Sequence, residues 1–585
     1  MSAASATPSK SSRPLAVYIS PSYAHWLPAM PFEVVSIFPE PGVFDLPRAL
    51  DERGLKPDCV FQDELLSPRV LLRGLWQLTC PKVFWSLDPH LNHYWQAPYA
   101  AQFDVTACTQ KAWLEPLARA GTGRAEWLTW CEPAGAWRPH GQRSHDLAFV
   151  GRIDGQRPLR RLFAEFLAER FPLRLETDLP YDAVAGVYAQ ARLAPNESIQ
   201  GEITQRLFLG AGQGCVMVEP GLDNGLDELF IPGREVSTYG DALELEDVLR
   251  AHLRRPEAAE AMGRAAWERL TREHQPRHRL QALGRLALDC GASARGGAGC
   301  GPGGRSVDES RASGGLGGGI AGGAQDLAQG ERLFRLAEAR CLESGLLAAP
   351  VEPVAEALLA WPGDPECVIA ALRLMAYAGR SGEALTLALQ LAGAGFAPPD
   401  CPFAVSGAAL ALRQGQLELA RTFLGRFLAA AGEGGKGLPE SPAGLHAAMG
   451  DMLLRHGLRW RPGFAFDAER HLPAVASECF FQALAAEPEN QGLTRKCESL
   501  LRQLPGTELV RLGLLSGLSL RNPGDFRLGL ALGLVNLRAF RVAQGLGELR
   551  LARDMAHGLG KAEAFERLLA VHDPHRRIRA ALRAG

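Results

Sequence analysis

The first half of the chain contains a run at 84–93, FWSLDPHLNH, whose polar side chains could act on a hydroxyl group. It follows an apolar stretch and places Asp88 two residues before His90. A carboxylate and an imidazole are common proton acceptors in catalysis, and both also hydrogen-bond sugar hydroxyls. An alternative is that Asp88 and Pro89 form only a turn and that the histidines are solvated. The residue types leave both interpretations open, with Asp88 and His90 as candidate catalytic residues.

A second run, FVGRIDGQR at 149–157, could hold a diphosphate. It takes an apolar stretch into a turn at Gly151 and Arg152, and a helix with basic residues at its start follows. Backbone N–H groups and a helix dipole favour an anion at such a place, and an arginine can clamp it. The alternative is an ordinary turn, because a single glycine and arginine are a weak signal.

A third group of polar residues contains Asn196, Ser198 and Arg206 and ends at Glu219. Glycines at positions 210, 212 and 214 lie between them and allow a ligand or a neighbouring element to approach the backbone closely. Glu219 ends an apolar run and could accept hydrogen bonds from ribose or sugar hydroxyls. The alternative is ordinary packing of a helix on a strand, with carboxylates at the surface.

These candidates need a scaffold, and the region before residue 290 alternates strand-like and helical patterns. Strand-like runs lie at 15–19, 32–38, 59–62, 82–88, 103–109, 146–154, 173–176 and 214–220, and helical patterns lie at 45–54, 110–121, 160–171, 241–253 and 256–272. This alternation predicts parallel sheets with helices on both faces. Two such series predict two Rossmann-like domains, 15–140 and 141–288, that face each other across a cleft. Ligands of such folds bind at the carboxyl ends of the strands.

The second half of the chain has no convincing strand. We expect a disordered lead at 1–14, a Gly-rich flexible linker at 289–326 and a helical domain at 327–585. Ala384 and Ala420 occupy similar places in successive helical hairpins, 36 residues apart. This spacing is close to the tetratricopeptide period of about 34 residues and favours a repeat array that binds protein partners. An irregular helical bundle is the alternative.

Composition excludes several classes of protein. The 585 residues include 63 basic and 65 acidic side chains, so the formal charge of -2 argues against a nucleic-acid binder with a broad basic face. No run is long and apolar enough to predict a transmembrane segment, and the N-terminal residues lack the apolar core of a signal peptide. The twelve cysteines are scattered without a C-x-x-C pair. We therefore expect a cytoplasmic protein with reduced cysteines and no zinc site.

The order of the motifs resembles the bacterial spore-maturation, CgeB-like glycosyltransferases over about residues 15–288. The motifs are W-x-x-D, F-V-G-R, N-x-S-I, R-L-F with a Gly-rich turn, D-E-L-F-x-P-G-x-E and Y-G-D. This resemblance implies a GT-B fold, in which the second Rossmann-like domain binds a nucleoside-diphosphate sugar. It also implies that the acceptor lies mainly against the first domain.

The resemblance also implies roles for single residues. Asp88 would lie on the acceptor side of the cleft, where it or His90 would position or deprotonate the acceptor hydroxyl. The implied donor- and phosphate-binding residues are Gly151, Arg152, Asn196, Ser198, Arg206, Glu219 and Glu228. No D-x-D motif occurs in the sequence, so we expect a metal-independent transfer of a hexose-like sugar without a further cofactor. The acceptor would be a protein, recruited by the helical repeats, or a glycan.

Two positions depart from the family pattern. Leu209 stands where the family carries a glutamate that is expected to hold the donor, and Glu202 or Glu219 could substitute for it. The lysine often paired with the Gly-Arg turn is also missing, and Arg157 or Arg160 could stand in. These departures keep an alternative open, which is a non-catalytic pseudo-glycosyltransferase that binds protein partners through its repeats.

Overall fold

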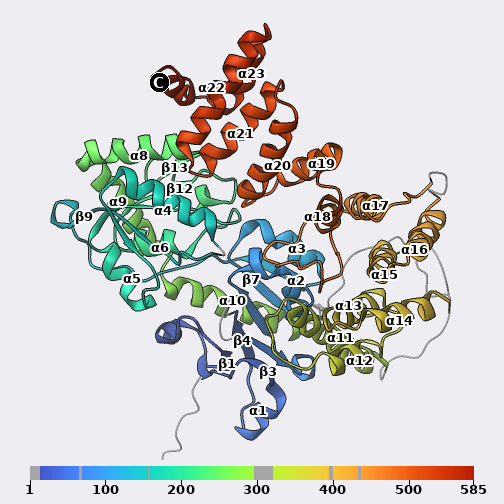
Figure 1. The fold of residues 1–585 in the computed structure, drawn as a ribbon. Coiled ribbons are helices and arrows are strands. Elements are labelled where there is room, and N and C mark those ends of the chain that lie inside the picture. The colour runs from blue at the N-terminus through green and yellow to red at the C-terminus, as the bar shows by residue number, and fades with distance from the viewer. Residues whose placement is uncertain are drawn as a thin grey trace, which may run out of the picture. The chain divides into compact units, whose positions relative to one another are not determined.

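The computed structural model describes residues 13–64, 69–155, 157–295, 321–393, 400–432 and 437–584 (Figure 1). Most of the expected lead and the middle of the expected linker, 296–320, lie outside these residues. The two ends of that linker are helical, because α10 (Pro276–Arg295) and α11 (Ala321–Glu343) extend into it.

The first sheet has six parallel strands in the order β2-β1-β4-β6-β7-β8. They are β1 (Leu15–Ile19), β2 (Glu33–Ile37), β4 (Cys59–Asp63), β6 (Lys82–Ser86), β7 (Val105–Cys108) and β8 (Ala125–Trp127). Its apolar strands are buried, as expected for a parallel sheet covered on both faces. Helices α2 (Pro89–Ala100) and α3 (Leu114–Arg119) follow β6 and β7. Two short strands, β3 (Gly42–Asp45) and β5 (Val70–Arg73), pair separately, and α1 (Leu46–Glu52) follows β3.

The second sheet has five parallel strands in the order β10-β9-β11-β12-β13. They are β9 (His145–Val150), β10 (Leu173–Glu176), β11 (Ala191–Pro195), β12 (Val216–Pro220) and β13 (Val236–Tyr239). Its helices are α4 (Pro158–Arg170), α5 (Tyr181–Tyr188), α6 (Gln205–Gly212), α7 (Leu226–Leu229), α8 (Ala242–Arg254) and α9 (Pro256–Glu273). The two parallel sheets, followed by a helical region, confirm the predicted fold class of two Rossmann-like parts and an all-α part.

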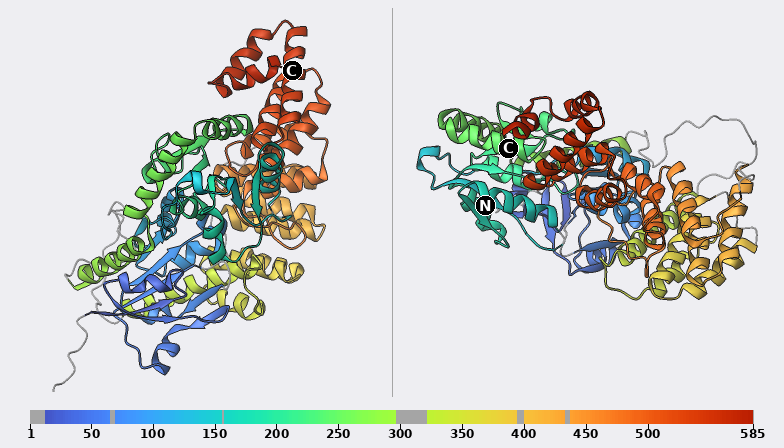
Figure 2. Two further views of the ribbon diagram at one scale, coloured as in Figure 1. Left: turned by 90° about the vertical axis from the view of Figure 1, so that its left-hand side faces the viewer. Right: turned by 45° about the horizontal axis from the view of Figure 1, so that its top comes forward.

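The helical region is drawn in yellow to red in Figures 1 and 2. After α11 it contains α12 (Glu352–Leu358), α13 (Pro365–Tyr377), α14 (Ser381–Gly393), α15 (Cys401–Arg413), α16 (Leu417–Ala430), α17 (Pro442–Arg455) and α18 (Ala476–Ala486). It continues with α19 (Gln491–Leu501), α20 (Glu508–Arg521), α21 (Phe526–Arg538), α22 (Val542–Gly558), α23 (Ala562–His572) and α24 (Arg577–Ala584). Side chains of Asp364, Asp400, Ser441 and Asn490 accept hydrogen bonds from backbone N–H groups and so fix helix starts. The tetratricopeptide character of this region stays a prediction.

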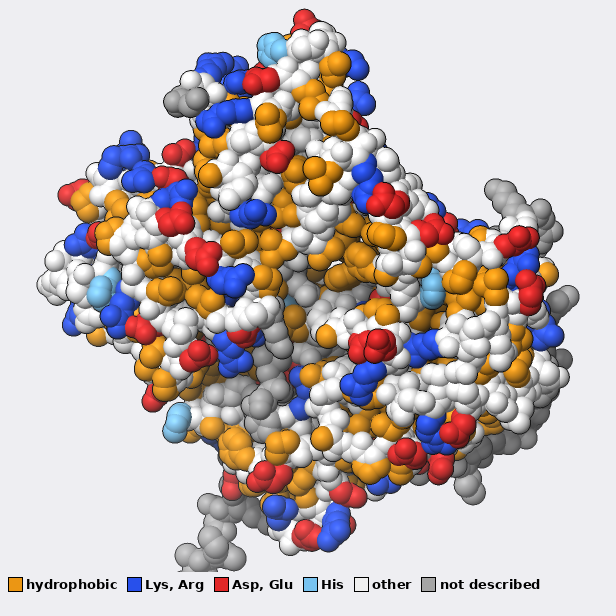
Figure 3. All heavy atoms as spheres, in the orientation of Figure 1, with side chains coloured by type: hydrophobic (Ala, Val, Ile, Leu, Met, Phe, Trp, Pro, Cys, Tyr) orange, Lys and Arg blue, Asp and Glu red, His pale blue; other side chains and the backbone are white. Residues whose placement is uncertain are grey.

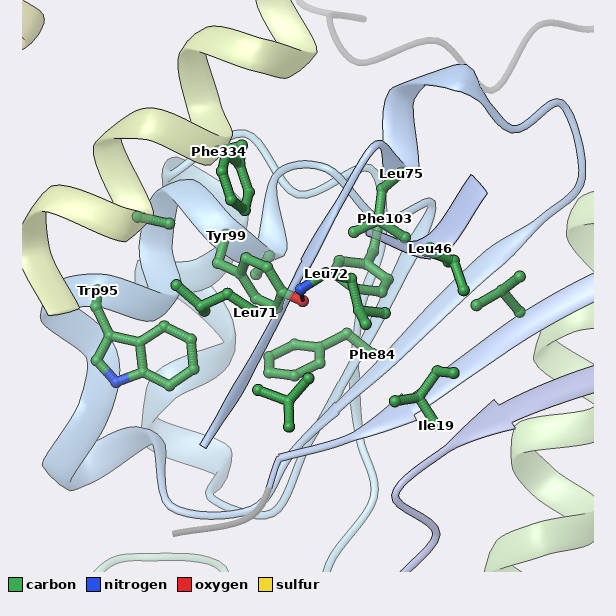
Figure 4. Close-up of a cluster of buried hydrophobic side chains, with 14 of the residues drawn as sticks. Ile19, Leu46, Leu71, Leu72, Leu75, Phe84, Trp95, Tyr99, Phe103 and Phe334 are labelled. Atoms are coloured by element: carbon green, nitrogen blue, oxygen red, sulfur yellow. Dashed lines mark hydrogen bonds between the residues drawn. The ribbon is translucent and has the colours of Figure 1, made fainter. Parts of the chain in front are cut away.

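Packing divides the described chain into two compact units. One combines the residues up to Thr129 with Pro276–Gln482, and the other combines Trp130–Gln275 with Ala483–Gly585. Each unit therefore contains one of the two main sheets and part of the helical region. In the first unit, Phe334 of α11 is buried in the core of the sheet, near Tyr99 and Phe103 (Figure 4). The domain limits drawn from the sequence stay a prediction, and packing groups the chain differently.

In the second unit, Phe540 packs in the same way against the sheet. The centroid of its ring lies 5.0 Å from that of Phe163, and Phe540 belongs to the core cluster of that sheet.

On the face drawn in Figure 3, acidic and basic side chains are interspersed, without one large patch of either sign. Among the residues that the structure describes, no helix is both long and apolar enough to span a membrane.

Candidate functional site

The second sheet brings Asn196 and Glu219 together at the carboxyl ends of two paired strands. Asn196 follows β11 directly, and Glu219 lies near the end of β12, which pairs with β11. Both side chains are buried, and Nδ2 of Asn196 donates a hydrogen bond of 2.8 Å to Oε2 of Glu219. The edge predicted to bind a ligand therefore carries a connected polar pair.

Arg206 joins this pair to the turn at Gly151. It is the second residue of α6, and its Nε donates a hydrogen bond of 2.7 Å to Oδ1 of Asn196. The guanidinium also lies 5.0 Å from the ring centroid of Phe149 on β9. A Cβ at Gly151 would come within 2.9 Å of Nη1 of Arg206, so a side chain there would push the guanidinium away. Four of the predicted donor-site residues thus meet at one edge.

Two further residues of this cluster were not among the predicted site residues. Glu197 is buried, and its Oε1 accepts hydrogen bonds from Nε of Arg160 and, at 3.1 Å, from Nη2 of Arg206. Arg160 lies in the first turn of α4, whereas the alternative Arg157 pairs with Asp154. Two guanidinium groups share one carboxylate, which leaves one positive charge. The basic start of the helix and the N-E-S-I motif were the sequence signals for these residues.

Glu219 is buried, and this burial raises its pKa to about 7. The hydrogen bond from Asn196 and the charge of Arg206 act in the opposite direction but do not offset burial. Its other oxygen, Oε1, is buried without a hydrogen-bond partner among the described residues. A carboxyl group with this pKa can accept or donate a hydrogen bond near neutral pH, which suits it to a ligand hydroxyl.

The other predicted donor residues lie apart from this cluster. Arg152 follows Gly151 but is 66% exposed, with Nε 3.7 Å from Oδ1 of Asp178. Oγ of Ser198 donates a hydrogen bond to Glu202, whose carboxylate also accepts bonds from two backbone N–H groups. Glu228 is exposed on α7. The roles assigned to these three residues stay predictions.

A second buried carboxyl group lies at the start of α6. Oε1 of Glu132 accepts hydrogen bonds from the hydroxyl of Tyr181 and, at 2.7 Å, from Nε2 of Gln205, the neighbour of Arg206. Burial raises the pKa of Glu132 to about 7. Glu132 precedes the second sheet in the chain, in a stretch without strand or helix, and no sequence pattern singled it out.

In the first unit, Asp88 follows β6 and is the N-cap residue of α2, where it is half-buried. Its backbone N–H and that of Leu87 donate hydrogen bonds of 3.1 Å and 3.0 Å to Oε2 of Glu64, which follows the neighbouring strand β4. His90 is buried in the first turn of α2. Asp88 is therefore the more accessible of the two predicted catalytic residues.

Glu64 and Asp63 form a buried acidic pair that was not among the predicted site residues. Asp63 accepts hydrogen bonds of 2.6 Å from the hydroxyl of Tyr18 and 2.7 Å from the backbone of Ser22, and burial raises its pKa to about 6. Burial also raises the pKa of Glu64, against the charge of Arg69, whose Nη1 lies 3.8 Å from Oε1 of Glu64. The signal was available as two consecutive carboxylates at the end of an apolar run.

Among the described residues, no three His, Cys, Asp or Glu side chains gather closely enough to hold a metal ion. The metal independence of a transfer reaction stays a prediction.

Comparison with known proteins gives one family match. Residues 114–285 match the model of a family described as glycosyl transferase-like. The match covers less than half of the chain, but it includes the whole cluster around Arg206. No curated protein matches the chain.

Several solved structures resemble it at low identity. Anabaena Alr3699/HepE in complex with UDP and glucose is 9% identical, over 48% of this chain and 100% of that one, with a TM-score of 0.34. Sucrose-phosphate synthase from Thermosynechococcus elongatus is 13% identical over the same shares, with a TM-score of 0.38. The pneumococcal O-GlcNAc transferase GtfA in complex with UDP and GlcNAc is 11% identical, over 41% of this chain and 59% of that one, with a TM-score of 0.31. These scores are too low to carry a conclusion about function.

Proposed function

We propose that the protein transfers a sugar from a nucleoside-diphosphate sugar to an acceptor hydroxyl. One observation carries the proposal: Asn196, Arg206 and Glu219 form a connected cluster over the Gly151 turn, at the carboxyl edge of a parallel sheet. Ligands of open α/β sheets bind at this edge. The cluster also lies inside the segment that matches a glycosyl transferase-like family.

Arg206 is the group that would stabilise the leaving diphosphate. It lies beside a glycine turn, where backbone N–H groups can approach a phosphate, and it shares Glu197 with Arg160 so that one positive charge is left over. Fixed positive charge where negative charge develops lowers the barrier without reorganisation. Arg152 at the same turn is exposed, and we propose it as a second, movable phosphate ligand. Ser198 and Glu228 would border the donor.

Glu219 would take the place of the glutamate that Leu209 replaces. The other candidate, Glu202, is engaged by Ser198 and two backbone N–H groups, whereas Oε1 of Glu219 has no protein partner among the described residues. That oxygen would accept a hydrogen bond from a ribose or sugar hydroxyl of the donor.

On the acceptor side, we assign Asp88 to orient the attacking hydroxyl and to accept its proton, with His90 behind it in α2. The two hydrogen bonds to Glu64 fix the backbone at 87–88, which would hold this carboxylate in place. We further propose a hexosyl transfer without a bound metal, with a protein or glycan acceptor. A cytoplasmic location is proposed because none of the described cysteines forms a disulfide, as in reducing compartments.

A panel of nucleotide sugars tests this proposal. The full chain is mixed with UDP-, GDP- and other nucleoside-diphosphate hexoses and with polypeptide and glycan acceptors, and both the melting temperature and the release of nucleoside diphosphate are followed. We expect one donor to raise the melting temperature as its concentration exceeds its dissociation constant, and the same donor to be consumed. The absence of both effects with every donor would refute the proposal.

Leu209 favours a second candidate, a pseudo-glycosyltransferase that serves as a scaffold. Leu209 is buried and cannot accept a hydrogen bond where the family carries a glutamate. The panel separates the two candidates, because a scaffold would show no release of nucleoside diphosphate with any acceptor.

A further inference from the structure

A pocket of about 600 Å³ lies within the first compact unit, outside the site described above. Its walls come from α2, α11, α13, the start of α15 and the segment 457–475. Its volume is in the range of pockets that bind small molecules or short peptides. Helix α2, which begins after Asp88, contributes His93 and Tyr94 to the wall.

Arg373 of α13 is a buried cation in this wall. It is 8% exposed, and its Nε has no hydrogen-bond partner. Within the described part of the chain, Arg373 forms no salt bridge, and the nearby carboxylate of Asp400 instead caps α15. An unpartnered guanidinium in a buried position is costly, so this side chain is suited to bind a ligand anion.

Arg461 is a second buried guanidinium in the same wall, also 8% exposed. Its Nε donates a hydrogen bond of 2.8 Å to Glu478, and its Nη1 lies 3.7 Å from Oε1 of Glu343. The group lies 3.6 Å from the ring centroid of Phe464 and 4.7 Å from that of Tyr94, which hold it in place. Both Nη1 and Nη2 still lack hydrogen-bond partners. Arg461 therefore offers donors without a net charge.

The charge balance limits the ligand to one negative charge. Arg332 and Arg340 in the wall are already paired, with Asp364 and Glu366. Burial lowers the pKa of His93 to about 4, so this ring is neutral at physiological pH. The wall contains five arginines and three acidic residues. The two carboxylates that hold Arg461 bring the acidic groups to five, so the positive and negative charges balance. A phosphate with two charges would therefore be disfavoured. A single carboxylate matches Arg373, and guanidinium binds carboxylate through two parallel hydrogen bonds.

The remaining wall indicates what carries this carboxylate. Ile369, Trp460 and Val475 line the pocket with apolar surface. A charged sugar would leave its hydroxyl groups against these side chains without hydrogen-bond partners. A peptide instead offers apolar side chains beside a carboxylate, together with carbonyl groups for Nη1 and Nη2 of Arg461.

We propose that this pocket binds an acidic segment of the acceptor polypeptide, with a carboxylate at Arg373 and neighbouring apolar side chains against Ile369 and Val475. The identification of this polypeptide as the acceptor rests on the proposed glycosyl transfer. The affinity of the pocket for acidic peptides rests only on the residues that line it. Because α2 joins the pocket wall to Asp88, the modified hydroxyl would lie in the same polypeptide as the bound carboxylate.

Fluorescence anisotropy with labelled pentapeptides tests the pocket on the full chain, without a sugar nucleotide. The first probe is Ala-Leu-Glu-Leu-Ala amide, which carries a side-chain carboxylate, and the second is the neutral Ala-Leu-Gln-Leu-Ala amide. The third is Ala-Leu-Gln-Leu-Ala with a free carboxyl end. The fourth is the first peptide with phosphoserine in place of glutamate. We expect the glutamate peptide or the free-ended peptide to bind at least about tenfold more tightly than the neutral amide, and the phosphopeptide to bind less tightly than either. The comparison of the first and third probes separates a side-chain carboxylate from a terminal one.

Arg373→Met, which keeps the apolar stem, should reduce the preference for carboxylate peptides below about twofold, while Arg373→Lys retains part of it. Arg380→Ala, a change just before α14 at a side chain that is 37% exposed, is the control and should bind like the parent. Circular dichroism confirms that each variant is folded. Equal affinity for acidic and neutral peptides, or a preference that survives Arg373→Met, would overturn the proposal. The donor assay does not use these peptides, so failure of the pocket and failure of the transfer proposal are distinguishable.

Discussion

Arg206 lies so close to Gly151 that a Cβ on the glycine would come within 2.9 Å of the Nη1 atom. The same guanidinium is held from the other side by Asn196 and Glu197. The carboxyl ends of two strands of the second sheet, β9 and β11, thereby position one cation, which is the structural basis of the proposed donor site.

Gly151→Ala should weaken donor binding by displacing this guanidinium. We expect a loss of about tenfold in affinity with little change in melting temperature, because the rest of the turn can remain as it is. The matched control is Gly155→Ala, since a Cβ at Gly155 meets nothing within 4 Å. Titration with the donor from the panel measures both. Equal affinities of the two variants would show that Arg206 does not act from its present position.

Asp88→Asn should slow the transfer and spare donor binding. Loss of a general base typically lowers kcat about 100-fold or more, and Asp88 belongs to a different compact unit from the donor cluster. Asp51→Asn, on the exposed surface of α1, is the control. Steady-state rates and donor dissociation constants are measured for both. An unchanged kcat in Asp88→Asn would remove Asp88 from the mechanism.

Glu132→Gln should stabilise the protein at alkaline pH. The pKa of Glu132 is raised to about 7 in the folded protein, so the folded state binds its proton more tightly than the unfolded state does. Its contribution to stability is therefore present below the unfolded pKa of about 4.3 and is lost as the pH rises to about 7. The variant should match the parent near pH 4 and exceed it by about 3–4 kcal/mol at pH 8, because a pKa difference from about 4.3 to about 7 is worth about 1.4 kcal/mol per pH unit. Denaturant unfolding at the two pH values measures this, and a constant difference would contradict the buried acid.

Phe334→Ala should destabilise the first sheet, although Phe334 belongs to the helical region. Its ring is fully buried in the core of that sheet, and truncation of a buried phenylalanine costs about 3–5 kcal/mol. Phe38→Ala is the matched control, because Phe38 is 64% exposed. Urea unfolding of both variants gives the difference. A small cost for Phe334→Ala would mean that α11 contributes little to the unit.

Part of this structure could be predicted from the sequence in physical terms. Alternating apolar and helical runs predicted two parallel sheets, and the carboxyl ends of neighbouring strands then bring Asn196 and Glu219 together. The strands β3, β5, β8, β11 and β13 were not among the predicted runs; β3 and β5 lie outside the two main sheets and pair with each other.

The other features of the fold and of the candidate sites depend on contacts between segments that are distant in the sequence. The hydrogen bond from Asp88 to Glu64 requires the pairing of β4 with β6, and the burial of Arg160 requires the position of α4 against Glu197. Arg373 and Arg461 come from different parts of the helical region and meet only in the folded wall of the pocket. The burial of Phe334 in a sheet could not be inferred from a helical pattern either, since the pattern shows an apolar face but not what covers it.

The most direct test of the donor site is the dissociation constant of the donor from the panel, measured by calorimetry for Arg206→Ala and for Arg161→Ala. Arg161 lies on α4 beside Arg160 but is 59% exposed, so it controls for the loss of one positive charge. We predict that Arg206→Ala weakens binding by at least about tenfold and that Arg161→Ala leaves it unchanged. Equal affinities of both variants and the parent would contradict the assignment of this cluster as the donor site.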